Sequence, residues 1–131
     1  MREIKFRVWD IPEKEYLKRE KVVVGNSQKR ESYIYIWRSS VDSSSNTLEW
    51  MMDDPECYIV EQYTGLHDKS GREIYEGDLI LIGAVFTQIK YRNETAAFEL
   101  MQKHGPIVLS NKYSGEYEII GNIHENPEIL K

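Results

Sequence analysis

The stretch of sequence that decides the fold is residues 62–80, QYTGLHDKSGREIYEGDLI. Three glycines divide it into short aromatic and apolar segments: Gly65, Gly71 and Gly77. Glycine adopts a positive φ at little cost, so residues 68–71 and 76–78 are predicted to form tight turns. The stretch therefore predicts short strands joined by glycine turns.

Short polar side chains stand beside these glycines. Such side chains commonly hydrogen-bond the backbone of their own turn. Asp68 is therefore expected to accept from amides near Gly71, and Asp78 from amides of the turn that contains Gly77. Gly121 is assigned the same structural role as the other three glycines. On this interpretation the stretch is a scaffold and not an active site.

Working outward, the chain alternates apolar and polar residues, which is typical of half-buried strands. The first such segment is residues 4–9, which a turn around Pro12 ends. Similar segments follow at residues 22–24, 33–37, 58–63, 79–82, 85–91, 97–101, 107–109 and 117–123. Turn signals recur about every ten residues, which favours a small sandwich or barrel.

These observations predict a mainly β protein in which N-terminal strands pack with a C-terminal SH3-like small barrel. The barrel is suggested by the Glu-Gly-Asp-Leu-Ile turn at residues 76–80, which leads into a hydrophobic strand. One domain over residues 1–131 is expected, with an N-terminal β part at 1–40 and the barrel part at 57–131. A serine-rich loop and a short helix over 48–54 are expected between them.

Both ends of the chain and residues 62–80 resemble one family. The opening MREIKFRVWD (residues 1–10) and the ending YEIIGNIHENPE (residues 117–128) are similar to the YopX family, small proteins of bacteriophages and prophages. The resemblance implies a fold and a phage context, but no reaction, because the family has no settled activity. It implies an accessory protein.

Charge is unevenly distributed along a chain whose net charge is −5. Residues 1–40 hold ten Lys and Arg against six Asp and Glu, a net of +4, and the remainder is −9. Opposite charge on the two parts suits self-association or an internal contact between them, and the alternative is that the charges are scattered over a solvated surface. No leader segment and no apolar run of the roughly 20 residues that span a bilayer is found. We expect the cytoplasm of the bacterial host as the location, and no membrane partner.

Residues that carry chemistry are sparse. Cys57 is the single cysteine, expected to be half-buried and inert, and the histidines at 67, 104 and 124 lack ligand spacing. The acidic group Asp53, Asp54 and Glu56 is interpreted as an exposed helix end. No phosphate-binding loop, dinucleotide fingerprint or nucleophile motif is present. The sequence predicts a non-enzymatic protein without metal or cofactor, which acts by binding to an unknown target.

One strand carries the candidate binding face. Aromatic side chains alternate along residues 33–37, and basic residues flank them; the set is Tyr33, Tyr35, Trp37, Lys29, Arg30 and Arg38. The favoured interpretation is that the rings pack in a core or against another subunit of a homo-oligomer. The alternative is single-stranded nucleic-acid binding, because each base stacks on a ring and each phosphate attracts a cation. The overall acidity of the chain disfavours nucleic acid.

Overall fold

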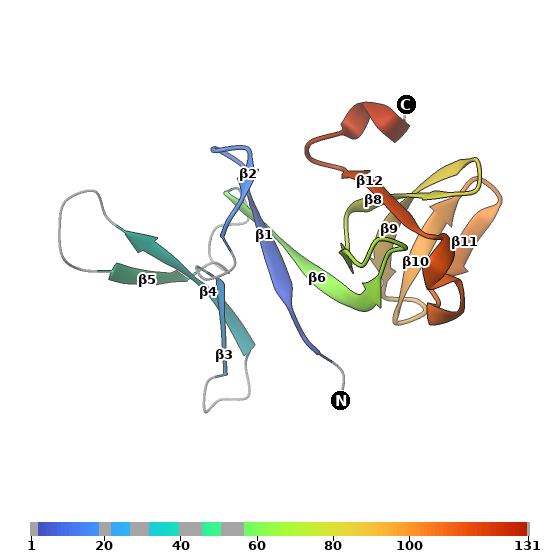
Figure 1. Ribbon diagram of the computed structural model, residues 1–131. Coiled ribbons are helices and arrows are strands. Elements are labelled where there is room, and N and C mark those ends of the chain that lie inside the picture. Colours follow the sequence, from blue (N-terminus) through green and yellow to red (C-terminus); the bar gives the residue numbers. More distant parts are fainter. Residues whose placement is uncertain (1–2, 19–21, 27–31, 40–45, 51–56, 131) are drawn as a thin grey trace. The chain divides into compact units, whose positions relative to one another are not determined.

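The computed structural model describes the backbone of residues 3–18, 22–26, 32–39, 46–50 and 57–130 (Figure 1). Side chains are described for residues 3–18 and 57–130. The chain divides into two compact units. Unit 1 comprises Met1–Phe6 and Glu61–Lys131, and unit 2 comprises Arg7–Val60.

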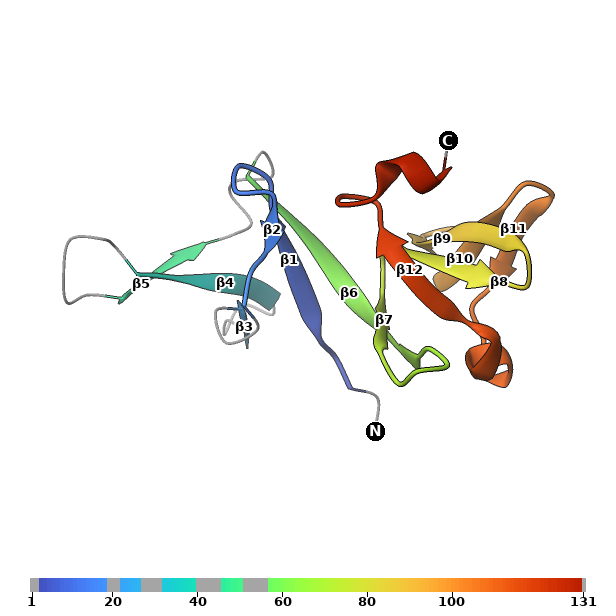
Figure 2. The ribbon, with the colours of Figure 1, turned by 45° about the horizontal axis from the view of Figure 1, so that its top comes forward.

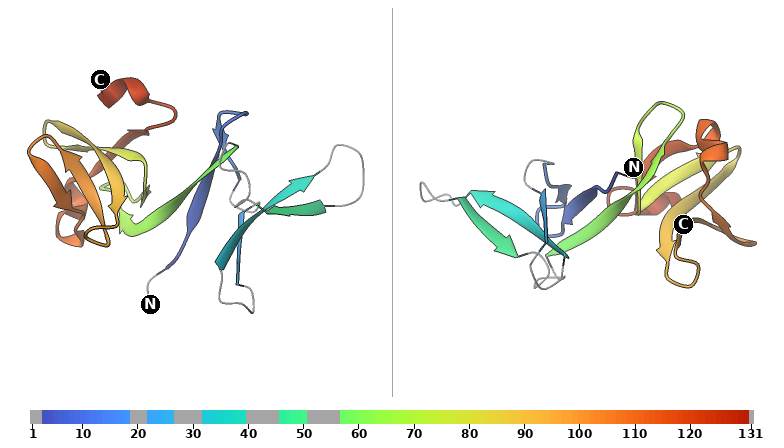
Figure 3. Two further views of the ribbon diagram at one scale, coloured as in Figure 1. Left: turned by 180° about the vertical axis from the view of Figure 1, so that it is seen from behind. Right: turned by 90° about the horizontal axis from the view of Figure 1, so that it is seen from below.

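Unit 1 is built on a five-stranded antiparallel sheet with the strand order β11-β10-β9-β8-β12. Its strands are β8 (Asp78–Ile82), β9 (Val85–Arg92), β10 (Ala97–Gln102), β11 (Gly105–Val108) and β12 (Glu118–Asn122). Two short 3-10 helices, η3 (Asn111–Glu116) and η4 (Pro127–Leu130), lie before and after β12. The last strand returns beside the first, and the sheet curls (Figures 2 and 3).

The core of unit 1 lies against one face of this sheet. Residues of alternating position on the strands are fully or almost fully buried there, and the cluster is Ile74, Ile80, Ile89, Leu100 and Tyr117. Period-two alternation places Ile80 of β8, Ile89 of β9 and Leu100 of β10 on the same face. The buried hydroxyl of Tyr117 is satisfied by the backbone of Ser110, which it both donates to and accepts from at 3.2 Å.

A four-stranded antiparallel sheet has the order β2-β1-β6-β7. Its strands are β1 (Phe6–Asp10), β2 (Glu15–Tyr16), β6 (Tyr58–His67) and β7 (Glu73–Tyr75). The pairing of β6 with β7 shifts register between Tyr63 and His67. Gly65 lies inside that shift with a φ of 89°, a conformation that side chains rarely tolerate.

Unit 2 contains a three-stranded antiparallel sheet and a small apolar cluster. The sheet has β4 (Ser32–Ser39) at its centre, between β3 (Val22–Asn26) and β5 (Asn46–Trp50). In the cluster, Val8 and Tyr58 are buried, and the partly buried side chains of Leu17 and Cys57 pack against them. Cys57 is therefore half-buried, as expected.

The mainly β fold is confirmed, and nearly every predicted strand is present. The short helix expected over residues 48–54 is wrong at its start, because Asn46–Trp50 form strand β5; residues 51–54 lie outside the described residues. Asn46 and Thr47 are residues that commonly cap a helix, but that signal is local, whereas pairing with β4 fixes the strand. Among the described residues, β11 and β12 stay at opposite ends of the curled sheet, so the SH3-like form remains a prediction, as do the boundaries at 40 and 57.

Candidate functional site

Asp68 organises the turn between β6 and β7. Its carboxylate is buried, and Oδ1 accepts from the backbone amides of Ser70 and Arg72, both at 2.9 Å, and from the Ser70 hydroxyl at 2.8 Å. Gly71 has a φ of 88° in the same turn. The predicted hydrogen bonds from amides near Gly71 are confirmed.

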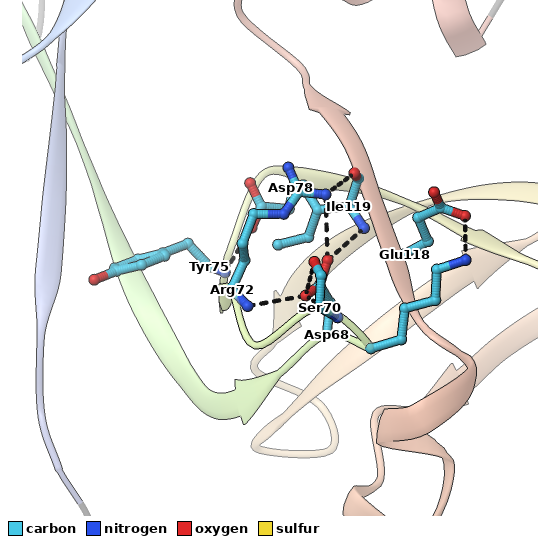
Figure 4. A network of polar contacts seen from close by, with 8 residues as sticks. Asp68, Ser70, Arg72, Tyr75, Asp78, Glu118 and Ile119 are labelled. Atoms are coloured by element: carbon cyan, nitrogen blue, oxygen red, sulfur yellow. Dashed lines mark hydrogen bonds and ion pairs between the residues drawn. The ribbon is translucent and has the colours of Figure 1, made fainter.

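The second carboxylate oxygen of Asp68 reaches β12. Oδ2 accepts from the amide of Ile119 at 3.2 Å and lies 3.3 Å from Nη2 of Arg72, and that guanidinium donates to the carbonyl of Ile119 at 2.6 Å (Figure 4). The Lys69 amide donates to the Tyr117 carbonyl at 2.9 Å, and its ammonium pairs with Glu118 at 2.8 Å. The turn thus covers the outer edge of β12, where a further strand would otherwise pair.

The pKa of Asp68 reflects these contacts. Burial alone would raise it, but hydrogen bonds from the amides of Arg72 and Ile119 and from Ser70 outweigh burial and lower the pKa to about 2. The carboxylate is therefore ionised at neutral pH, and its charge is stabilised mainly by donors from its own chain. The lowered pKa thus follows from the hydrogen bonds that hold this turn together.

The following turn is held in the same way. Asp78 Oδ2 accepts from the amide of Tyr75 at 2.8 Å (Figure 4), which confirms that Asp78 binds its own turn. The Thr64 hydroxyl donates to the carbonyl of Ile74 at 2.8 Å and accepts from the amide of Leu66. Residues 64–78 therefore direct these polar groups at their own backbone.

Glu61 and His124 form a buried pair that the sequence did not predict. Glu61 Oε1 and His124 Nε2 are 2.5 Å apart, and both side chains are at least nine-tenths buried. Gly77 lies against this pair with a φ of 87°; a Cβ built there would be 2.5 Å from Glu61 Oε1. The amide of Ile123 donates to the carbonyl of Gly77 at 3.0 Å. Gly77 is thus required by backbone conformation and by close approach.

The residues after β12 are held by two asparagines. Asn122 Oδ1 accepts from the amides of His124 and Glu125, and Asn126 Oδ1 accepts from the amide of Asn122. Gly121 has no positive φ, so its predicted role as a turn residue needs correction. A Cβ there would overlap the Asn126 side chain, and close approach explains the glycine.

A third polar group surrounds Tyr63. Lys5 Nζ pairs with Glu73 Oε1 at 2.7 Å and lies 5.2 Å from the centroid of the Tyr63 ring. The Tyr75 hydroxyl donates to Glu73, and the Tyr63 hydroxyl is 3.4 Å from Nδ1 of His67. Burial raises the pKa of Tyr63, the Glu73 charge raises it further, and Lys5 opposes both.

The predicted binding face is described only in its backbone. β4 is the central strand of its sheet: Tyr33 is opposite Gly25, Tyr35 is opposite Val23 and Trp50, and Trp37 is opposite Leu48. The side chains of Tyr33, Tyr35, Trp37 and Arg38 are not described, and Lys29 and Arg30 lie outside the described residues. So do Asp53, Asp54 and Glu56. Whether the rings form a core, an interface or a platform stays a prediction.

Metal-ligating residues do not gather in the described part of the chain, where no three His, Cys, Asp or Glu side chains are placed to hold an ion. The three histidines have different surroundings: His67 lies beside Tyr63, His124 is hydrogen-bonded to Glu61, and His104 is exposed between β10 and β11. The absence of metal and cofactor stays a prediction. No helix in the described segments has the length and apolar character that crossing a membrane requires.

The fold and the site define a class: a small, mainly antiparallel β protein in which polar side chains hydrogen-bond the backbone of its own turns. The model of one protein family, described as YopX protein, matches residues 5–131. The chain belongs to the YopX family. No curated protein matches it.

Two solved structures are similar over the whole chain. Protein EF1440 from Enterococcus faecalis is 29% identical, with a TM-score of 0.68 and complete coverage of both chains. Protein yopX from Bacillus subtilis is 15% identical, with a TM-score of 0.57, and the match covers 100% of this chain and 98% of that one. The second likeness concerns the fold alone.

Proposed function

We propose that this chain is a non-enzymatic accessory protein of a bacteriophage or prophage, and that it works by binding, as a homo-oligomer, in the cytoplasm of the bacterial host. Its target is an unidentified protein. The proposal extends the family membership, which by itself specifies no activity.

The observation that carries the proposal is the contrast between polar and apolar groups in unit 1. In residues 64–78 and 122–126, side-chain carboxylates, hydroxyls and amides form hydrogen bonds with the backbone of the same segments. Large apolar side chains are instead exposed on the strands and after them: Val85, Phe86, Tyr91, Ile107, Val108, Tyr113 and Leu130. Large exposed apolar side chains that gather in a patch are typical of a protein-binding surface.

Oligomerisation is tested by size-exclusion chromatography with light scattering, at micromolar concentration and two salt concentrations. We expect a mass of at least twice the 15.5 kDa of the chain, because the exposed apolar side chains and the opposite charges of its two parts favour association. A mass of 15.5 kDa at both salt concentrations would contradict the oligomer.

Single-stranded nucleic-acid binding is the second candidate, favoured by the aromatic residues at alternate positions of the central strand β4. The measurement is fluorescence anisotropy of a labelled oligothymidylate. At about 0.15 M salt we expect only weak, non-specific binding, with a Kd of about 10 μM or more. A submicromolar Kd that Trp37→Ala weakens, and that the exposed control Tyr113→Ala does not, would make nucleic acid the target instead.

A further inference from the structure

Both edges of the five-stranded sheet offer few free backbone groups for strand addition. The turn at Asp68 covers the edge of β12. Directly after β11, the amide of Leu109 donates to the carbonyl of Phe98 on β10. The amides at every second position before it, those of Ile107 and Gly105, therefore point toward β10. Pro106 and Val108 then hold the outward positions, and Pro106 has no N–H. A partner of unit 1 is therefore expected on a face of the sheet.

On the face opposite the core cluster, four strands carry a strip of apolar side chains, which Gln88 interrupts and which the buried Leu79 and Glu99 border. We call it the outer strip; its residues are Leu81, Phe86, Met101, Pro106 and Val108. Leu81 is directly opposite Phe86, and Met101 is directly opposite Pro106. Phe86 and Met101 are diagonal neighbours, because Gln88, two positions from Phe86, is opposite Met101. Phe86 is 53% exposed and Val108 is 54% exposed.

Two exposed lysines accompany the outer strip. Lys90 lies on the same face of β9, and Lys103 directly follows β10. Lys90 is opposite Glu99, but that buried carboxylate accepts from Thr95 at 2.7 Å and lies 3.5 Å from Arg92 Nη1. Neither Lys90 nor Lys103 has an ion pair among residues 3–18 and 57–130. The outer strip therefore suits a partner that offers aliphatic side chains next to carboxylates.

The same unit presents such a segment. Residues 125–130, around η4, expose the carboxylates of Glu125 and Glu128 and leave Leu130 46% exposed. Neither carboxylate has an ion pair in the described part of the chain. Among residues 3–18 and 57–130 both carboxylates are thus unpaired and Leu130 is only partly covered, although η4 lies beside β9.

We propose that the outer strip of one copy binds residues 125–130 of a second copy. Lys90 and Lys103 then face Glu125 and Glu128, and Leu130 packs on the aliphatic side chains of the strip. A two-fold dimer makes this contact twice and closes without leaving a free strip. The proposal rests on the proposed homo-oligomer and names the surfaces that form it.

A charge swap tests the pairing. In light scattering, K90E/K103E alone and E125K/E128K alone should each weaken self-association at least about tenfold, because attraction becomes repulsion in each. An equimolar mixture of the two variants should recover association, since both contacts of the mixed dimer pair opposite charges. The control K18E/K112E changes net charge as much as K90E/K103E at exposed lysines elsewhere and should associate like the unchanged chain.

The possible outcomes distinguish a failure of this inference from a failure of the proposed function. A monomeric unchanged chain contradicts both. An oligomer that neither variant weakens contradicts the inference alone, and so does loss of association in both variants without recovery in the mixture. Thermal unfolding of each variant shows whether a loss of association comes from misfolding. We expect an unchanged Tm, because all four substituted side chains are exposed.

Discussion

Gly77→Ala is expected to destabilise the protein by about 3 kcal/mol or more, lowering Tm by about 10 °C. Two costs combine. The φ of 87° strains any residue with a Cβ, and the new methyl group would overlap Glu61 Oε1 at 2.5 Å. Glu61 cannot move away cheaply, because it is buried and hydrogen-bonded to His124. Differential scanning calorimetry measures the change.

Gly71→Ala is the matched control for Gly77→Ala. Its φ of 88° is the same within a degree, but a Cβ there meets nothing within 4 Å. It should cost only about 1 kcal/mol, the strain of the left-handed conformation. Equal losses of stability for the two variants would show that the overlap with Glu61 is relieved at no cost, and that the Glu61–His124 pair does not confine this part of the fold.

Most of the fold could be predicted because its signals are local. Val85, Thr87, Ile89 and Tyr91 occupy alternate positions, and β9 spans Val85–Arg92. Strands β2 and β7 were missed, because two or three residues carry too little periodicity to be recognised. The segment from Leu48 follows the cap-like residues Asn46 and Thr47 and alternates over three residues only, so its pairing with β4 is what makes it a strand.

The contacts of the candidate site likewise fall into local ones, which the sequence predicts, and long-range ones, which it does not. Asp68 and Asp78 bind amides within four residues, so turn chemistry alone predicted those contacts. The bond from Asp68 to Ile119 spans 51 residues, and the Glu61–His124 pair spans 63. No spacing rule links such positions; only the path of the chain through the sheet brings them together. From the sequence, His124 is seen only to lack the spacing of a metal ligand.

The proposed dimer contact relies on long-range structure of the same kind. Phe86, Met101 and Val108 come from three strands, and only the register of the sheet shows that they adjoin on one face. In the sequence each appears as one member of an alternating strand. The sequence also does not show which lysines lack an ion pair. Lys90 is opposite Glu99, and only the structure shows that Glu99 pairs with Arg92 instead.

Asp68→Asn is expected to cost about 2 kcal/mol at pH 7. The amide keeps the shape of the side chain, but it lacks the charge that Arg72 pairs with and places an NH2 group where one oxygen accepts. Chemical denaturation measures the loss. Ser70→Ala, which removes a single hydroxyl donor at 2.8 Å, should cost about 1 kcal/mol and serves as the milder control. Once folded, both variants should associate like the unchanged protein.

The pH dependence of stability tests whether the missing charge causes the loss of stability in Asp68→Asn. Its pKa is about 2 in the folded protein, below the ordinary 3.8. The unfolded chain therefore takes up the proton first, and the contribution of Asp68 is fully present above pH 4 and is lost as pH falls from about 4 to 2. The stability difference between the unchanged protein and Asp68→Asn should shrink over that window. A difference that stays constant down to pH 2 would show that the Asn variant loses hydrogen-bond geometry and not charge. Loss of association by Asp68→Asn at unchanged stability would instead make this turn a binding site.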